Sequence, residues 1–219
     1  MVKTSVNTSN ISKSLTKIEL INAGKRFNKE WIFKGVHQTF QPGQKYAITG
    51  SNGSGKSTLL QTIAGNMPVS AGQIEWHEAS LIQPELVYQY FSIATPYLEL
   101  IEEMSGMELL QFHASFKPLS KEKNIPEILE MIGLGKTANK QISKYSSGMK
   151  QRLKLAQAIF SDTPVLLLDE PCTNLDKEGY ALYQSLIQNY CNDKIVIICS
   201  NEEAEIHFCT TRIHINDYK

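Results

Sequence analysis

The stretch Gly50-Ser51-Asn52-Gly53-Ser54-Gly55-Lys56-Ser57 decides the fold class of this chain. Its spacing fits the pattern G-x-x-x-x-G-K-[ST], a loop between a strand and a helix that cradles phosphates. The backbone N–H groups of such a loop curl around the β- and γ-phosphates, and the helix start adds the positive end of its dipole. Lys56 would supply charge and Ser57 a hydroxyl for Mg²⁺. A bare glycine-rich turn is the competing interpretation.

The residues on either side of this loop agree with the phosphate-loop interpretation. Residues 46–49, Tyr-Ala-Ile-Thr, follow a Pro42-Gly43 turn and predict a strand. Residues 57–64 predict a helix that ends at Gly65 and carries three apolar residues on one side: Leu59, Leu60 and Ile63. The order strand, glycine loop, helix is the one that a phosphate loop requires.

Further along the chain, two short apolar runs predict buried parallel strands. They are Val165-Leu166-Leu167-Leu168 and Ile195-Val196-Ile197-Ile198, and an amphipathic crossover helix is expected between them over Lys177 to Tyr190. Ile18-Glu19-Leu20 and Trp31-Ile32-Phe33 predict an additional β-rich opening.

Apolar residues at helical spacing predict a helical insert over residues 98–150. We therefore expect an α/β fold with a phosphate-loop core, in which helices flank a mostly parallel sheet. An N-terminal antiparallel β-subdomain and the helical subdomain would complete a domain over residues 17–219.

Two carboxylates follow the first buried run, at Asp169 and Glu170. Open α/β sheets bind their ligands beyond the carboxyl ends of their strands. Asp169 would hold Mg²⁺, and Glu170 would be the general base that polarises an attacking water. Alone, an apolar run before Asp-Glu is also a common strand end and helix cap.

Composition restricts the classes of function. The 219 residues are 42% apolar, which is typical of a folded domain. Because 22 basic residues balance 22 acidic ones, the chain lacks the basic surplus of a nucleic-acid-binding protein, and no nucleic-acid partner is expected. The apolar runs are shorter than the roughly 18 residues of a membrane helix. Residues 1–16 form a polar stretch without the apolar core of a secretory signal, and we expect a mobile tail on a cytoplasmic protein. The four cysteines show no metal-type or disulfide-type spacing.

A third motif, Tyr145-Ser146-Ser147-Gly148-Met149-Lys150-Gln151-Arg152-Leu153, places small residues before a predicted helix. Such an N-terminus can bind an anion, although an ordinary capped helix has the same pattern. With the phosphate loop before it and Asp169-Glu170 after it, the sequence resembles the nucleotide-binding domain of ATP-binding-cassette (ABC) proteins. The resemblance covers nearly the whole chain beyond the tail.

The resemblance implies an Mg²⁺-dependent ATPase whose domains pair head to tail, as a homodimer or with a related cassette. Ser146, Ser147 and Gly148 would then meet the γ-phosphate of ATP held by the other subunit. The loop that would cross the dimer interface in this chain is Thr173-Asn174-Leu175-Asp176. The residues implied to contact ATP are Phe27, Ser51, Asn52, Gly53, Ser54, Gly55, Lys56, Ser57, Thr58 and Asn201.

Three residues have a less specific match to the family pattern or depart from it. Phe27 takes the place of an aromatic that stacks on adenine, although an ordinary buried aromatic is the alternative. Tyr97 stands where the family has a glutamine that helps ligate Mg²⁺, and a packed structural role is the alternative. Asn201 stands where the family has a histidine; it can donate to the γ-phosphate but cannot relay a proton, which predicts slower turnover.

The function implied is that of an ATP-hydrolysing subunit on the cytoplasmic face of a membrane. It would couple ATP-driven dimer closure to a separate membrane permease. Ser147 and Met149 give the third motif a resemblance to exporter-type subunits. Two alternatives stay open: a soluble ABC-type switch that acts on a macromolecule, and an ATP-binding partner of low turnover.

Overall fold

A computed structural model describes residues 15–219 of the chain. The predicted polar tail over residues 1–16 falls mostly on residues 1–14, which lie outside the described part. Its last two residues belong to the folded structure. The Leu15 side chain is buried, and the Thr16 backbone N–H donates to the carbonyl oxygen of His77 at 2.7 Å.

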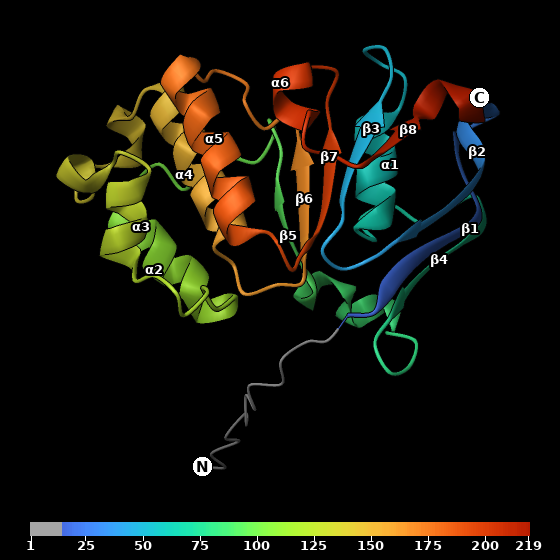
Figure 1. Cartoon of the computed structure of the whole chain (residues 1–219), viewed down its shortest axis with the longest axis horizontal. Helices are drawn as coiled ribbons and strands as arrows, with labels where there is room; N and C mark the ends of the chain where they lie inside the picture. The colour runs from blue at the N-terminus through green and yellow to red at the C-terminus, as the bar shows by residue number, and fades with distance from the viewer. Residues whose placement is uncertain (1–14) are drawn as a thin grey trace.

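A parallel sheet with strand order β5-β6-β7-β3-β8 lies at the centre of the molecule (Figure 1). Its members are β3 (Lys45–Thr49), β5 (Phe91–Ala94), β6 (Val165–Asp169), β7 (Ile195–Cys199) and β8 (Thr211–His214). Every residue of β6 and β7 is buried, as expected for central strands covered on both faces. Both apolar runs are therefore confirmed as neighbouring parallel strands.

Side chains of β6 and β7 point alternately to two apolar cores, because successive side chains of a strand face opposite sides of the sheet. One core joins the parallel sheet to helix α1 (Lys56–Ile63) and contains Val165, Leu167, Ile195 and Ile197. The other joins it to the remaining helices and contains Leu166, Leu168, Val196 and Ile198. The sheet thus separates a β-rich side from a helical side.

An antiparallel sheet of strand order β2-β1-β4 covers the far side of α1 (Figure 1). Its strands are β1 (Lys17–Phe27), β2 (Glu30–Phe40) and β4 (Ala71–His77). Four of their large side chains share the core of α1, namely Ile18, Phe33, Phe40 and Trp76. The predicted fold class, a parallel core with an antiparallel subdomain and helices, is confirmed.

The helical side begins with α2 (Gly106–Phe116) and α3 (Ile125–Met131), both inside the predicted helical region. Ser105 with Glu108 and Asn124 with Glu127 form capping boxes at their N-termini, which satisfy the first free N–H groups of each helix. The other helices are η1 (Pro84–Gln89), η2 (Gly135–Thr137), η3 (Ile142–Lys144), α4 (Ser147–Ile159), α5 (Lys177–Tyr190), α6 (Glu203–Ile206) and η4 (Ile215–Tyr218).

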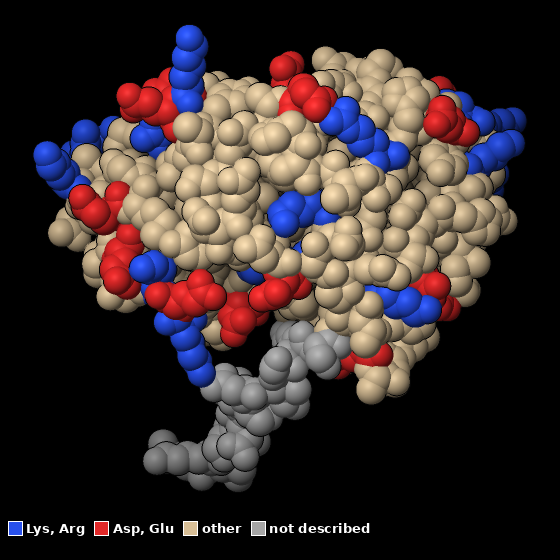
Figure 2. Space-filling view, in the orientation of Figure 1, with Lys and Arg blue, Asp and Glu red and all other residues tan. Residues whose placement is uncertain are grey.

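Charged side chains of both signs are spread over the face drawn in Figure 2, with wide uncharged areas between them. This distribution matches the formal net charge of zero. Between residues 15 and 219, no helix has both the length and the apolar character needed to cross a bilayer.

His113 on α2 is a part-buried histidine held in its neutral form between α2 and α4. Its Nε2 lies 2.8 Å from the Ser161 hydroxyl, which itself donates to the Gln157 carbonyl oxygen, so Nε2 is the donor. Its Nδ1 accepts from the Gln157 side-chain amide at 3.0 Å. Burial lowers the pKa of His113 to about 4, and the nearby charge of Lys117 adds to this effect.

We expect His113 to make the fold less stable in mild acid. Because its pKa is lower in the folded than in the unfolded state, its contribution is complete above about pH 6.5 and is lost as the pH falls toward 4. The loss should be at most about 2 kcal/mol, because solvent reaches part of the ring. Urea unfolding between pH 7 and pH 4.5 measures it.

The matched controls are His113→Gln, which removes the titrating group, and His207→Gln, which removes an exposed histidine. Wild type and His207→Gln should lose stability more steeply than His113→Gln over this range. Parallel curves for all three proteins would show that His113 does not titrate in this way.

Candidate functional site

The candidate site lies where three neighbouring strands of the parallel sheet end. Strands β6, β7 and β3 are adjacent, and their registers pair Asp169 with Cys199 and Cys199 with Ile48. The segments that follow these strands therefore leave the same edge of the sheet. They begin at Gly50, Glu170 and Ser200, so the three sequence-predicted segments are brought together at one place.

The phosphate loop fills the space between β3, which ends at Thr49, and α1, which begins at Lys56. Gly50 has a φ of 147° and Gly55 a φ of 102°, backbone conformations that favour glycine. Space is also limiting, since a Cβ on Gly55 would lie 2.4 Å from Ile32 Cγ2. A Cβ on Gly50 would lie 2.5 Å from Ile215 Cγ2. Strand β2 and the C-terminal η4 thus pack against the loop from two sides.

The Lys56 side chain folds back onto the phosphate loop. The residue is buried, and its Nζ donates to the carbonyl oxygens of Gly50 at 2.7 Å and Ser51 at 3.3 Å. The ammonium is therefore already placed inside the curl of the loop. A second ammonium, that of Lys219, donates to the Ser54 carbonyl oxygen at 2.7 Å. This contact could not be found from sequence, because the two residues are 165 positions apart.

Asp169 ends β6 as a buried carboxylate, and its Oδ1 has no hydrogen-bond partner within the described part of the chain. Burial raises the pKa of Asp169, while the Ser57 hydroxyl and the charge of Lys56 oppose the rise. A buried oxygen without a partner is costly unless a ligand satisfies it. The Asp169 carboxylate and the Ser57 hydroxyl are hard oxygen donors, which suit Mg²⁺.

Glu170 differs from Asp169 in being exposed and in having a left-handed backbone, with a φ of 44°. Non-glycine residues in this conformation are uncommon and gather at functional sites. The Glu170 N–H donates to the Cys199 carbonyl oxygen at 2.9 Å, and Thr173 closes a turn on the Glu170 carbonyl. The carboxylate is thus free to act on a group in solvent while its backbone is held.

Asn201 contacts the phosphate loop directly. Its Oδ1 accepts a hydrogen bond from the Gly50 backbone N–H at 3.0 Å. Because the oxygen is occupied in this way, the two N–H groups of the side-chain amide remain as donors. This orientation suits an oxygen of the γ-phosphate, the partner implied by the sequence.

The third motif forms the start of α4, as predicted. The Ser146 hydroxyl accepts from the Met149 N–H at 3.2 Å and caps the helix. A Cβ on Gly148 would lie 3.1 Å from the Asn174 carbonyl oxygen, so the motif lies against the predicted interface loop.

Two residues that follow the cap attach α4 to the segment after Glu170. The buried Gln151 donates to the Pro171 carbonyl oxygen at 2.6 Å, and Arg152 contacts Asp176 at 3.3 Å. Sequence reasoning missed both contacts. Their only sequence signal was a polar Gln151 on the apolar side of a helix.

The two aromatic candidates are exposed. Phe27 ends β1 with 47% of its surface accessible, so the alternative of an ordinary buried aromatic is wrong. Lys25 Nζ lies 5.3 Å from the centre of the Phe27 ring. Tyr97 is 89% exposed, so its alternative as a packed structural residue is also wrong. A role of Tyr97 near Mg²⁺ stays a prediction.

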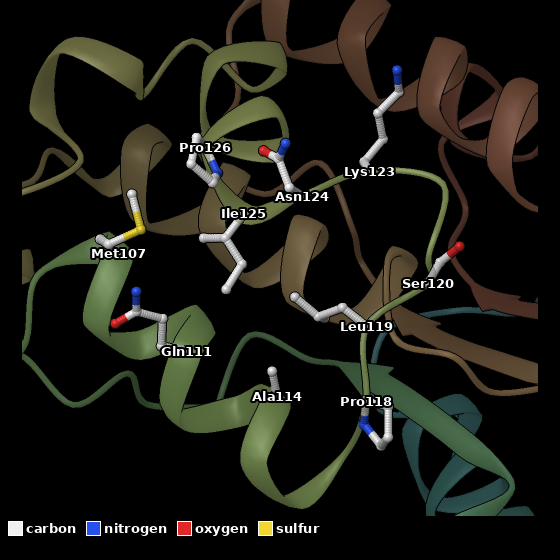
Figure 3. A pocket seen from close by; sticks show the side chains of 10 residues that line it. All are labelled: Met107, Gln111, Ala114, Pro118, Leu119, Ser120, Lys123, Asn124, Ile125 and Pro126. Atoms are coloured by element: carbon white, nitrogen blue, oxygen red, sulfur yellow. The ribbon is translucent and has the colours of Figure 1, made fainter. Parts of the chain in front are cut away.

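A separate hollow lies between α2 and the segment 118–126 (Figure 3). It has a volume of about 730 Å³ and is open to solvent. Met107, Gln111 and Ala114 of α2 form one wall, and Leu119 and Ile125 face them. No candidate site residue lines it, so the hollow is separate from the site described above.

Known proteins that are similar to this chain are ABC transporter ATP-binding proteins. The family model described as ABC transporter matches residues 33–173. The uncharacterized ABC transporter ATP-binding protein YybJ of Bacillus subtilis (strain 168) is 29% identical over 201 residues, which cover 91% of this chain and 92% of that protein.

Two solved structures share the fold. One, described as an ATP binding subunit of an ABC transporter, has a TM-score of 0.81 and 22% identity, and the match covers 91% of this chain and 86% of that one. The other, described as the dimeric structure of MJ0796, a bacterial ABC transporter cassette, has a TM-score of 0.76 and 21% identity, over 90% and 94% of the two chains.

Proposed function

The chain belongs to the ABC transporter family, in which it is an ATP-binding subunit, and on that premise we propose that it hydrolyses ATP with Mg²⁺ to drive a separate membrane permease. The observation that carries this proposal is the edge of the sheet where β3, β6 and β7 end. There the phosphate loop, the Asp169-Glu170 pair and Asn201 lie around one place.

ATP binding would use the phosphate loop first. Backbone N–H groups of residues 51–58 and the start of α1 would hold the β- and γ-phosphates, and the Lys56 ammonium would exchange loop carbonyls for phosphate oxygens. The Asn201 amide would donate to the γ-phosphate. Phe27 would stack on adenine, for which its exposed ring is available.

The donor set at Asp169 and Ser57 fits Mg²⁺, and the orphaned Asp169 oxygen supports this assignment. When bound there, Mg²⁺ would neutralise charge on the phosphates. Glu170 would accept a proton from the attacking water. The water oxygen forms a bond to the γ-phosphorus, the bond from that phosphorus to the bridging oxygen breaks, and ADP and inorganic phosphate result.

A second cassette would complete each site. Ser146, Ser147 and Gly148 at the start of α4 would approach the γ-phosphate held by the partner cassette, since a helix N-terminus favours an anion. Residues 173–176 would line the interface between the cassettes. The exposure of Asn174 and Asp176 and the resemblance to a dimeric cassette support this arrangement.

An apolar groove beside the helical region is the candidate site for the permease. Its volume is about 170 Å³, and its lining includes Leu98, Ile101, Phe112 and Phe116. Phe116 is 76% exposed and its ring meets that of Phe112 edge to face. Two more aromatic side chains, those of Tyr88 and Tyr97, are also exposed, whereas Phe91 is buried in the core.

Exposed aromatic rings of this kind are typical of a protein interface. We propose that a short cytoplasmic helix of the permease fills this groove. The ATPase subunit would thereby be held on the cytoplasmic face of the membrane.

The test is affinity purification of the tagged chain in mild detergent. We expect a protein with several membrane spans to copurify in stoichiometric amount. Phe116→Asp should lower the recovered permease at least about tenfold, because burying an unpaired carboxylate in an apolar groove costs several times RT. Leu81→Asp, at another exposed apolar residue outside the groove, is the control. Recovery of ribosomes without a membrane protein would contradict the proposal.

A further inference from the structure

Glu205 on α6 is a buried glutamate that neither the phosphate loop nor the third motif accounts for. It is 3% exposed and forms no ion pair within the part of the chain that the structure describes. Its Oε1 accepts from the Cys172 backbone N–H at 2.9 Å, whereas its Oε2 has no hydrogen bond of good geometry among residues 15–219. Burying such a carboxylate costs free energy, which indicates a task beyond packing.

The contacts of Glu205 join two segments of the candidate site. Cys172 lies two residues after Glu170, in the turn that the structure closes by hydrogen bonds from Thr173 to the Glu170 carbonyl oxygen. Burial raises the pKa of the Glu205 carboxyl, and the side chain of Ser200 opposes this rise. Ser200 directly precedes Asn201, and its backbone N–H donates to the Ile48 carbonyl oxygen at 3.2 Å.

The turn after Glu170 needs such a support. Glu170 is held in a left-handed conformation, which is strained for a residue with a side chain. The Gln151 amide holds the Pro171 carbonyl from α4, and Glu205 holds the Cys172 N–H from α6. The Cys172 N–H is buried, so without Glu205 it would lack both an acceptor and water.

We propose that Glu205 is a positioning residue for ATP hydrolysis: by accepting from Cys172 beside Ser200, it keeps the Glu170 carboxylate and the Asn201 amide in one fixed arrangement. The inference rests on the proposed function and adds to it a residue that itself touches neither ATP nor water. Because the phosphate loop has its own supports, Glu205 should affect turnover and leave ATP binding nearly unchanged.

Helix α6 has anchors that do not involve the Glu205 side chain. The Tyr183 hydroxyl donates to the Glu205 backbone carbonyl at 3.0 Å, and Gln184 donates to the Ala204 carbonyl at 2.9 Å. A change of the Glu205 side chain should therefore leave α6 in place on α5. This separation allows the side chain to be tested in a folded protein.

The experiment compares Glu205→Gln, Glu205→Asp and Glu205→Ala in the full chain, with kcat and KM for Mg²⁺-ATP and equilibrium binding of a fluorescent ATP analogue as readouts. Glu205→Ala and Glu205→Asp withdraw the acceptor from Cys172. Each should lower kcat by about tenfold to a hundredfold, the effect of a displaced reacting group, and change KM and the analogue Kd less than about threefold. Glu205→Gln keeps an acceptor oxygen at the same reach, so its kcat should stay within about threefold of wild type.

Thr163→Val is the matched control for loss of a buried hydrogen bond. Thr163 precedes the opposite end of β6, where its hydroxyl donates to Ser92 at 3.0 Å. Its kcat should match wild type even if its melting temperature falls. If Glu205→Ala does not fold, the contrast between Glu205→Asp and Glu205→Gln carries the test.

Three results would overturn the inference: an unchanged kcat in Glu205→Asp, a parallel loss of kcat and ATP binding, or equal damage in Glu205→Gln and Glu205→Asp. Failure of the proposed function is a different outcome. In that case the wild-type chain itself would release no phosphate from ATP, or would do so equally with Lys56→Ala.

Discussion

Glu170→Gln is expected to bind ATP normally and to lose turnover by at least about a hundredfold, the contribution of a general base. Glutamine has nearly the same shape as glutamate but cannot take the proton from the attacking water. The phosphate contacts of Lys56 and the loop stay intact, so uncleaved ATP should accumulate between two cassettes. Light scattering after size-exclusion chromatography in Mg²⁺-ATP measures the dimer, and phosphate release measures turnover.

Glu122→Gln supplies the control, because Glu122 is an exposed glutamate in the helical region with the same chemistry. It should turn over ATP like wild type and should not accumulate a dimer. Normal hydrolysis by Glu170→Gln would show that another group accepts the proton.

Lys56→Ala is expected to weaken ATP binding by about tenfold to a hundredfold, since a hydrogen bond to a charged group is worth about 1.5–3 kcal/mol. The structure explains why no neighbour replaces it. Lys56 is the buried lysine whose Nζ lies inside the loop, on the Gly50 and Ser51 carbonyls. Titration with a fluorescent ATP analogue gives the dissociation constant.

Lys194→Ala is the matched control, because Lys194 also donates to two backbone carbonyl oxygens, those of Ile159 at 2.9 Å and Ser161 at 2.7 Å. It lies before the start of β7, at the opposite edge of the sheet from the site. ATP binding should be unchanged in a folded Lys194→Ala. Equal losses in the two variants would mean that Lys56 acts through the fold rather than on phosphate.

The fold could be predicted from sequence where local patterns carry it. Residues 165–168 and 195–198 are continuous apolar runs, and both form strands covered on both faces. The loop between Thr49 and Lys56 could be placed because its glycines have positions dictated by backbone geometry. Strand order could not be predicted in the same way, because it depends on which strands pair, and β3 pairs with two strands that lie far away in the sequence, β7 and β8.

The candidate site was predictable only in part, because some of its residues act through contacts with residues that are distant in the sequence. Motif positions such as Lys56 and Asp169 carry their chemistry in the residue itself. Glu205 and Gln151 act through contacts with Cys172 and Pro171, and nothing in the local sequence shows those contacts. The exposure of the Phe116 ring could not be predicted, because an apolar residue on a helix has the same pattern in a core and in a docking groove.

The proposed function requires that the loop beginning at Gly50 holds ATP for hydrolysis. The most direct test is release of inorganic phosphate from ATP by the purified wild-type chain, with Mg²⁺ and with EDTA, beside Lys56→Ala. We predict release that requires Mg²⁺ and is abolished in Lys56→Ala. Absence of release from the wild-type chain, or release that survives in Lys56→Ala, would contradict this function.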